Sequence, residues 1–303
     1  MGTPEFAVPT LELLIQNGYE VVAVVTATDK LGGRGGKQPI QSPVKQYALQ
    51  AGIPILQPEK LKAPEFVEAL KSYYADLQIV VAFRMLPEVV WSMPRLGTMN
   101  LHGSILPKYR GAAPINWAII HGEKETGVTT FFLKHEIDTG DVLMVEKLAI
   151  GENDTAGIIH DKMMVMGAET VLQSVRLVES GHYTLQSQQD IEASHAPKIF
   201  NETCEIDFRL KVDAVHNFVR GLSPFPTAWT SLNGLKLKVF MTNKEVGQPN
   251  HAIGAFVTDQ KTFIKVACSD GYIHLLDLQL EGRKRMDVKS FLNGYTLHNP
   301  TTN

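Results

Sequence analysis

Cysteine, long apolar runs and an excess of one charge are all scarce in this sequence. Among 303 residues there are two cysteines, Cys204 and Cys268, which lie far apart and lack the close spacing of a metal site. They are typical of reduced thiols in a cytosolic protein. No apolar run approaches the roughly 18 residues that a membrane span needs, and no basic-then-apolar segment opens the chain. We therefore expect a cytoplasmic protein with neither a membrane span nor a secretion signal.

The charge and the motifs of the sequence argue against several classes of binding protein. The net charge is −3, so no overall positive field indicates a nucleic-acid partner. Gly2-Thr3-Pro4 is not a G-x-G-x-x-G fingerprint, so a nicotinamide cofactor is not expected. The histidines lack the spacing of metal ligands, and we expect no metal. With 44% hydrophobic and 20% charged residues, the chain is an ordinary globular protein that is long enough for two domains.

The first two thirds of the chain alternate between strand and helix patterns. This alternation predicts an α/β fold with a Rossmann-like, doubly wound and mostly parallel sheet. Ser42 followed by Pro43 is a typical helix start, with serine as the cap. In chain order, the pattern gives a strand at 19–26, a helix at 42–52, a strand at 53–56, a helix at 64–74 and a strand at 77–82.

The last hundred residues have a different pattern of short strands separated by Asn-Gly and Asp-Gly turns. This spacing predicts a small antiparallel β-barrel of the OB type. A polar stretch before it reads as a linker. We expect a first domain at 1–181, a linker at 182–200 and a C-terminal domain at 201–303. The expected strands lie at 228–232, 235–242, 254–258, 263–267 and 272–280.

Asn100 and His102 lie at the end of an expected buried strand. Two positions apart, their side chains project to the same face, at the edge where ligands bind in open α/β sheets. A carboxamide and an imidazole there offer a neutral hydrogen-bond donor and a group that can move a proton near pH 7. A structural histidine and a turn-capping asparagine are the alternatives. The chemically specific loop that follows, with Arg110-Gly111, favours a functional site because packing hardly explains it.

Two further stretches each leave two interpretations open. Asp138, before Thr139-Gly140, is either a simple turn residue or part of a site. Residues 29–39 combine four glycines with three basic residues. Such a loop is either a solvated linker or a flexible contact for a phosphate backbone, because lysine and arginine release counterions when they bind phosphate.

The run NLHGSILPKYRGAAPINWAI, with the later IDTGDVL, resembles the methionyl-tRNA formyltransferase family, among the enzymes that use 10-formyltetrahydrofolate. The similarity covers nearly the whole chain and is most specific over residues 98–141. It implies transfer of a formyl group from 10-formyltetrahydrofolate to the α-amine of initiator methionyl-tRNA, a step of translation initiation. It also implies a formyltransferase catalytic domain followed by an OB-like tRNA-binding domain. We expect a monomer.

The resemblance also implies roles for individual residues. The expected catalytic residues are Asn100 as oxyanion donor, His102 as proton shuttle and Asp138 as the group that orients the imidazole. The segment that matches the family's folate-binding segment is Ser104, Ile105, Leu106 and Pro107. Phe83, Met85 and Leu86 are candidate pterin contacts or core residues. Both roles stay open there because Arg84 stands where family members have glycine.

Contacts to tRNA are expected from three basic residues. Arg34 matches the key arginine of the family's inserted loop, which grips the tRNA acceptor stem, and Lys37 lies in the same loop. Arg110 either meets the phosphate of the terminal nucleotide or holds its own loop.

The N-terminal end departs from the resembling family, in which a hydrophobic strand precedes the glycine that corresponds to Gly2. We therefore expect the natural protein to have a strand-length segment before Met1. Without such a strand, its neighbours lose ladder bonds and an apolar slot opens, which destabilises the domain.

Two alternative functions remain open from sequence. One is a folate-dependent formyltransferase that acts on a small amine such as an amino sugar nucleotide. The glycine-rich basic loop and the C-terminal barrel argue against it. The other is a folate- or RNA-binding module without catalysis, against which the presence of Asn100, His102 and Asp138 argues.

Overall fold

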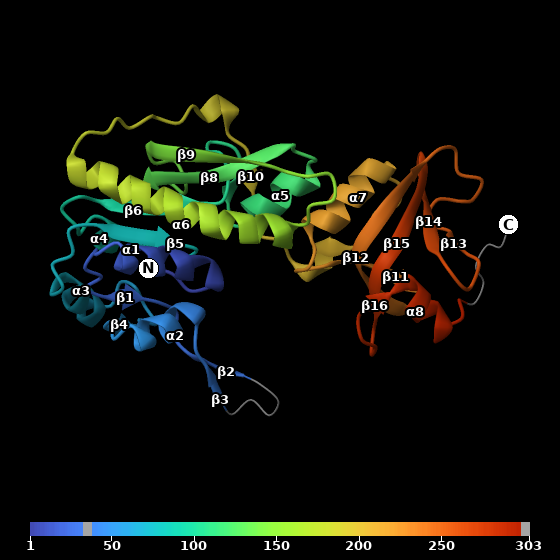
Figure 1. Ribbon diagram of the computed structural model, residues 1–303, viewed down its shortest axis with the longest axis horizontal. Coiled ribbons are helices and arrows are strands. Elements are labelled where there is room, and N and C mark those ends of the chain that lie inside the picture. Colours follow the sequence, from blue (N-terminus) through green and yellow to red (C-terminus); the bar gives the residue numbers. More distant parts are fainter. Residues whose placement is uncertain (33–37, 298–303) are drawn as a thin grey trace. The chain divides into compact units, whose positions relative to one another are not determined.

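The computed structural model describes residues 1–32 and 38–297, which form two compact units (Figure 1). The first unit comprises Met1–Gly111, Gly127–Leu148 and His160–His195. The second comprises Ala112–Thr126, Ala149–Ile159 and the chain from Ala196 onward. Two segments before residue 160 therefore group with the C-terminal part, and the units alternate along the chain. The boundaries expected near 181 and 201 stay a prediction.

The first unit consists of alternating strands and helices. Its helices are η1 (Glu5–Ala7), α1 (Val8–Gln16), α2 (Pro43–Gln50), α3 (Pro64–Lys71), α4 (Glu88–Trp91), α6 (Ala156–Ser180) and η2 (Asp190–Glu192). Its strands are β1 (Val24–Val25), β2 (Lys30–Gly32), β3 (Gln38–Ile40), β4 (Ile55–Leu56), β5 (Gln78–Val81), β6 (Thr98–His102), β7 (Arg110–Gly111), β8 (Glu125–Phe132), β9 (Val142–Ala149) and β10 (His195–Ala196). The expected cap of α2 is present, since the Ser42 side chain accepts the backbone N–H of Lys45.

The central sheet confirms the expected α/β class. Its strands are ordered β5-β6-β8-β9, with β6 parallel to β5 and antiparallel to β8. A second, parallel pair is formed by β1 and β4. Gly2 links the two pieces, because its N–H donates to the carbonyl oxygen of Val25 and it forms a parallel bridge with Val81. The pairs β1–β4 and β5–β6 are parallel, and β8 runs antiparallel to β6.

A cavity of about 720 Å³, lined by apolar, polar and charged side chains, lies beside Met1 and Gly2. It is lined from one side by residues 21–25 and from the other by residues 77–79, with Leu14 of α1 contributing to its wall.

Helix α6 covers one face of the central sheet (Figure 1). The hydroxyl groups of Ser174 on α6 and Thr130 on β8 lie 2.7 Å apart and share a hydrogen bond. At Gly167 the helix approaches β6 so closely that a Cβ atom would lie 2.7 Å from Leu101 Cδ2. Since side chains alternate along a strand, Leu101 facing α6 leaves Asn100 and His102 on the opposite face.

The second unit contains the curled antiparallel sheet that the C-terminal sequence predicts. Its strands are ordered β11-β12-β15-β14-β13, and β16 pairs with β15. A β-bulge interrupts β12 between Val239 and Thr242. The strands are β11 (Ala228–Leu232), β12 (Leu235–Val246), β13 (Phe256–Thr258), β14 (Ile264–Cys268), β15 (Gly271–Leu280) and β16 (Met286–Asp287). The helices are α5 (Pro114–Ile120), η3 (Asn201–Cys204), α7 (Val212–Gly221) and α8 (Val288–Asn293).

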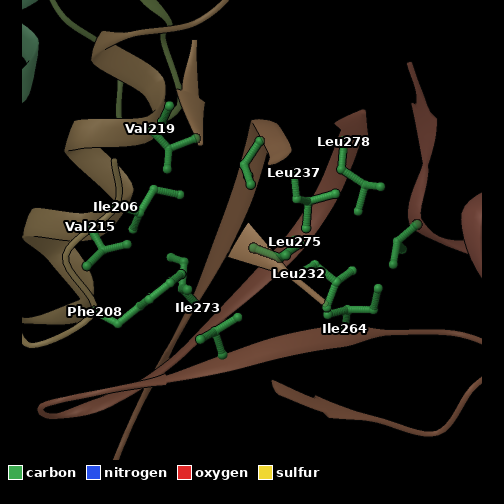
Figure 2. Close-up of a cluster of buried hydrophobic side chains, with 14 of the residues drawn as sticks. Ile206, Phe208, Val215, Val219, Leu232, Leu237, Ile264, Ile273, Leu275 and Leu278 are labelled. Carbon is green, nitrogen blue, oxygen red and sulfur yellow. The ribbon is translucent and has the colours of Figure 1, made fainter. Parts of the chain in front are cut away.

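The core of the second unit lies between the helices and the inner face of the curled sheet. Figure 2 shows Val215 and Val219 of α7 facing strand residues such as Leu237 and Leu275. Both cysteines are free and buried in this core. Helix α5 packs on α7, and the Asn116 side chain donates to the carbonyl oxygen of Gly221 at 2.8 Å. Across the described ranges, no helix is both long enough and apolar enough to cross a membrane.

Candidate active site

Asn100 and His102 lie at the carboxyl-terminal end of β6, an inner strand of the central sheet. Asn100 lies between Val80 of β5 and Phe131 of β8 in the ladder, which fixes its backbone on both sides. The Asn100 side chain is partly exposed, whereas His102 is 6% exposed. The two side chains project to the same face, as the sequence predicts, and the face they share points away from α6.

His102 is held in one orientation by backbone and carboxylate oxygens. Its Nε2 atom lies 2.9 Å from the carbonyl oxygen of Tyr109. Because a carbonyl oxygen accepts hydrogen bonds but cannot donate them, Nε2 carries a proton and donates it. Nδ1 lies 3.7 Å from Asp138 Oδ2, a distance for an ion pair but too long for a direct hydrogen bond. Nδ1 is therefore the ring nitrogen that is not engaged with Tyr109, and it faces the Asp138 carboxylate.

Asp138 is positioned by contacts that are distant in sequence. Its Oδ2 atom accepts the backbone N–H of Gly111 at 2.8 Å. Its backbone has φ +56°, in the left-handed region that few residues other than glycine adopt. Gly140, two residues later, packs so tightly that a Cβ atom would overlap the carbonyl oxygen of Phe132. The Asp138 carboxylate thus contacts Gly111 and faces His102, both distant in sequence. These contacts go further than the simple turn role that the sequence left open.

Asp141, in the same Asp-Thr-Gly-Asp run, has a different environment. Its Oδ1 atom accepts hydrogen bonds from Lys134 Nζ at 2.8 Å and from Ser187 Oγ at 3.1 Å. The hydrogen bond from Lys134 lowers the pKa of this carboxyl group. Asp141 therefore ties its loop to neighbouring segments, while Asp138 faces His102.

Arg110 lies next to Gly111 and is buried, with 8% of its surface exposed. Its Nε and Nη2 atoms donate to Gln188 Oε1 at 3.0 and 2.9 Å, and Nη1 donates to Asp190 Oδ1 at 2.9 Å. Of its two expected roles, this geometry favours holding the loop. Gln188 also donates to the carbonyl oxygens of Asp138 and Gly140, each at 2.8 Å. The sequence does not reveal Gln188, because this residue lies in a polar stretch without a motif.

The expected folate-binding segment follows β6 directly. Ser104 and Leu106 are buried, whereas Ile105 and Pro107 are partly exposed and so available to a ligand. Thr129 of β8 fixes this turn, since its hydroxyl donates to the carbonyl oxygen of Ser104 at 2.7 Å and accepts the N–H of Leu106 at 3.1 Å. Thr129 is another residue that the sequence does not reveal, because nothing distinguishes it from the other threonines of this strand.

The three candidate pterin contacts differ in exposure. Leu86 is buried in a hydrophobic cluster with residues of β5 and α3, and Phe83 packs against the same cluster. Met85 is 72% exposed. Arg84 donates to the carbonyl oxygens of Glu59 and Pro58, so its side chain anchors this loop. A core role fits Leu86 and Phe83, and Met85 is the one free to meet a ligand.

The expected tRNA-binding residues Arg34 and Lys37 lie outside the described residues. The strands that flank them, β2 and β3, form an antiparallel hairpin. Asp29 anchors its base through Lys45 Nζ at 2.6 Å and Gln57 Nε2 at 2.8 Å. The hydrogen bond from Lys45 lowers the pKa of the Asp29 carboxyl group.

The arrangement at the end of β6 fits acyl transfer between two nitrogens. It offers a carboxamide donor, an imidazole with one free nitrogen, and a carboxylate that stabilises the charged imidazole. Within residues 1–32 and 38–297, no three histidine, cysteine, aspartate or glutamate side chains cluster so as to hold a metal ion.

Comparisons with known proteins agree with this chemistry. The family model described as formyl transferase matches residues 1–175, and that for the formyl transferase C-terminal domain matches residues 198–296. A methionyl-tRNA formyltransferase of Bacteroides fragilis is 52% identical over 307 residues, covering 98% of this chain and 94% of the relative. One of Porphyromonas gingivalis is 49% identical over 308 residues, covering 98% and 95%.

Solved structures share the fold at lower identity. The sugar 3N-formyl transferase WlaRD superposes with a TM-score of 0.68 at 20% identity, covering 93% of this chain and 97% of that one. An N-formyltransferase from Helicobacter canadensis gives a TM-score of 0.67 at 21% identity, covering 90% and 96%. At this identity the likeness concerns the fold. The full-length similarity at about half identity, together with the matches of both family models, shows that this chain belongs to the methionyl-tRNA formyltransferase family of formyl transferases.

Proposed function

We propose that the protein transfers the formyl group of 10-formyltetrahydrofolate to the α-amine of initiator methionyl-tRNA, giving N-formylmethionyl-tRNA. The observation that carries this proposal is the meeting of His102 and Asp138 at the end of β6, beside Asn100 on the same strand. The relatives at about 52% identity, which are named methionyl-tRNA formyltransferases, support this acceptor.

The reaction exchanges one carbon–nitrogen bond for another. The folate supplies the formyl group, whose carbon is attacked by the free α-amine while its bond to N10 breaks. A proton leaves the attacking nitrogen, and one arrives at the departing nitrogen. The carbonyl oxygen carries negative charge in between, so a donor and a proton carrier are the two groups that the protein must supply.

The residues at the end of β6 suit these two tasks. The Asn100 carboxamide donates to the developing oxyanion, a contact whose loss typically costs about 10²–10³ in rate. Nδ1 of His102 takes the proton from the amine and returns it to the departing nitrogen, because Nε2 is engaged with Tyr109. The Asp138 carboxylate stabilises the imidazolium that forms between these two events.

We also propose binding roles for folate and tRNA, on the residues that the family resemblance indicates. We place the folate against Ser104, Ile105, Leu106 and Pro107, with Phe83, Met85 and Leu86 beside it. The partly exposed Ile105 and Pro107 and the exposed Met85 support this placement. Arg34 and Lys37 are proposed to hold the tRNA acceptor stem. We further propose that the protein acts in the cytoplasm as a monomer, which light scattering of the purified protein would test.

A direct test compares acceptors. The purified protein is incubated with 10-formyltetrahydrofolate and either charged initiator tRNA, charged elongator tRNA or a dTDP-linked amino sugar, and formylated product is quantified by chromatography. We expect turnover with the initiator tRNA and none with the amino sugar. Turnover with the sugar alone would replace the proposed acceptor by a small amine. Absence of transfer to every amine would indicate a binding module.

A further inference from the structure

The Gln188 side chain joins two segments of the candidate active site. Its amide nitrogen donates to the carbonyl oxygens of Asp138 and Gly140, both at 2.8 Å. Its amide oxygen accepts from Nε and Nη2 of Arg110, at 3.0 and 2.9 Å. Both N–H groups and the oxygen of this carboxamide are therefore engaged.

The chemistry of the partners permits one orientation of this amide. Carbonyl oxygens accept hydrogen bonds and a guanidinium donates them, so a flipped amide would place oxygen against two oxygens and N–H groups against N–H groups. Every one of the four contacts would then be repulsive. Glutamine fits this position because it presents two donors on one side and an acceptor on the other.

The hydrogen bonds close a ring that includes the carboxylate facing His102. Arg110 and Gly111 are consecutive residues, and the N–H of Gly111 donates to Asp138 Oδ2 at 2.8 Å. Gln188 connects Arg110 to the backbone of Asp138. The backbone and the carboxylate of Asp138 are thus both tied to the same short strand, β7.

A neighbouring ion pair adds little to this ring. Asp190 also accepts from Arg110, at 2.9 Å, but 84% of its side chain is exposed. Such pairs are screened by solvent and contribute weakly. Asp138 itself has a φ of +56°, a conformation that persists where the surroundings enforce it. Gln188 helps to hold this backbone conformation, because it donates to the carbonyl oxygens of Asp138 and Gly140 on either side of Thr139.

We propose that Gln188 is a positioning residue for formyl transfer, which holds Asp138 next to His102 Nδ1 by connecting the 138–140 loop to Arg110. This inference rests on the proposed function, because formyl transfer is the reaction that its test measures. Gln188 lies in the segment between α6 and η2 and would be an additional residue of the candidate site. Gln188 acts through Asp138 and His102 and touches no reacting atom.

The decisive variant is Gln188→Glu. Glutamate keeps an acceptor for Arg110 and adds charge, so it strengthens that contact, but it sets a carboxylate against the carbonyl oxygens of Asp138 and Gly140. If Gln188 served merely to anchor Arg110, this variant would retain activity. If it positions Asp138, kcat falls roughly tenfold or more, because small displacements of catalytic groups cost large factors, while KM for folate and tRNA stays within about threefold.

A double-mutant cycle separates positioning from general damage. In the Asp138→Asn background, Gln188→Glu should reduce kcat no further, because the carboxylate that it positions is already gone. Gln189→Ala, an exposed neighbour, is the matched control and should keep wild-type kinetics. Thermal unfolding verifies that each variant is folded, and Gln188→Met replaces Gln188→Glu if the latter does not fold.

The outcomes distinguish this inference from the proposed function. The wild-type protein is first assayed with each acceptor, and the cycle is run with whichever amine it formylates. Wild-type kcat in Gln188→Glu, or losses that multiply in the double variant, would overturn the positioning role and leave the formyltransferase assignment intact. Formylation of an amine other than methionyl-tRNA would overturn the proposed acceptor and still test Gln188.

Discussion

The tautomer of His102 follows from one backbone contact. The Tyr109 carbonyl oxygen takes the Nε2 proton, so Nδ1 carries the lone pair in the neutral ring and faces Asp138. The proposed mechanism therefore uses Nδ1 for the proton transfers.

Replacing His102 tests the proposed proton carrier. We expect His102→Ala to lower kcat by at least about 10², because general acid–base catalysis contributes ~10²–10⁴. Formylation of methionyl-tRNA under saturating substrates measures the effect. His135→Ala is the control, since His135 is exposed and pairs with Glu88 at the surface. Activity of His102→Ala within threefold of wild type would remove His102 from the mechanism.

A second histidine, His216, makes stability depend on pH. It is 4% exposed in the second unit, where Nδ1 lies 2.9 Å from Thr242 Oγ1 and Nε2 lies 3.4 Å from the carbonyl oxygen of Glu152. Burial lowers its pKa, and the nearby cations Arg220 and Lys244 lower it further. The unfolded chain therefore binds a proton at a higher pH than the folded protein does.

Stability should consequently decline as pH falls below about 6.5, the pKa of an unperturbed histidine. The free energy of unfolding in urea, compared at pH 7.5 and 5.5, measures this decline. The carboxyl groups with lowered pKa, such as Asp213, affect stability at lower pH. The α-amino group of Met1, whose pKa burial lowers to about 5, titrates in the same window, so the His216 variant, and not the window alone, identifies the contribution of the histidine. The variant His216→Gln should weaken the dependence of the unfolding free energy on pH. If the unfolding free energy of that variant falls between pH 7.5 and 5.5 as much as that of the wild type, groups other than His216 cause the decline.

At the residue scale, the sequence could predict pairs with a simple spacing and not contacts between distant segments. Asn100 and His102 share a face because they are two apart on a strand. Asp138 entered through family resemblance, because its local sequence indicates a turn, and its contact with Gly111 spans 27 residues. Gln188 lies in a stretch whose composition indicates a linker, and its role follows from four tertiary hydrogen bonds.

At the element scale, strand length depends on neighbours as much as on sequence. The apolar run at 19–26 predicts an eight-residue strand, yet β1 comprises Val24–Val25. These two residues pair with β4, whereas residues 21–23 line the cavity beside Met1 and Gly2. A ladder requires a partner, so the run forms a regular strand where a partner lies alongside it.

The loop after β8 depends on glycine at position 140. Because a Cβ atom there would overlap a backbone carbonyl oxygen, Gly140→Ala must displace the loop that carries Asp138. We expect a stability loss of about 1–3 kcal/mol and a fall in kcat of roughly tenfold or more. Urea unfolding and the formylation assay measure the two effects. Gly294→Ala, where the added methyl meets an ordinary contact at 3.7 Å, should change neither.

At the scale of the whole molecule, the second unit is not a contiguous stretch of sequence. It takes in Ala112–Thr126, which contains α5, and Ala149–Ile159. Composition and strand spacing correctly indicate an antiparallel C-terminal sheet. The boundary at 201, which rests on the linker-like polar stretch before it, stays a prediction. Packing of α5 on α7 is invisible to any local pattern.

This grouping predicts how a C-terminal fragment behaves. A fragment of residues 201–303 lacks α5, so the Gly221 carbonyl oxygen loses the Asn116 side chain, and the core loses Ile120, which packs against it. Ile120 is partly buried, so the loss of its contacts costs less than the roughly 2–5 kcal/mol of a fully buried isoleucine. We expect the fragment to unfold at clearly lower urea concentration than the same unit in the intact chain, as followed by circular dichroism.

A fragment in which residues 112–126 are joined to residue 196 by a flexible linker supplies the control. It restores α5 to the surface of α7 and should recover part of the lost stability, while the same fusion carrying Ile120→Ala and Asn116→Ala should recover less. Equal stability of the short and the fused fragments would show that α5 contributes nothing to the second unit. In that case the boundary near 201, which the sequence alone indicates, would be the correct place to divide the chain.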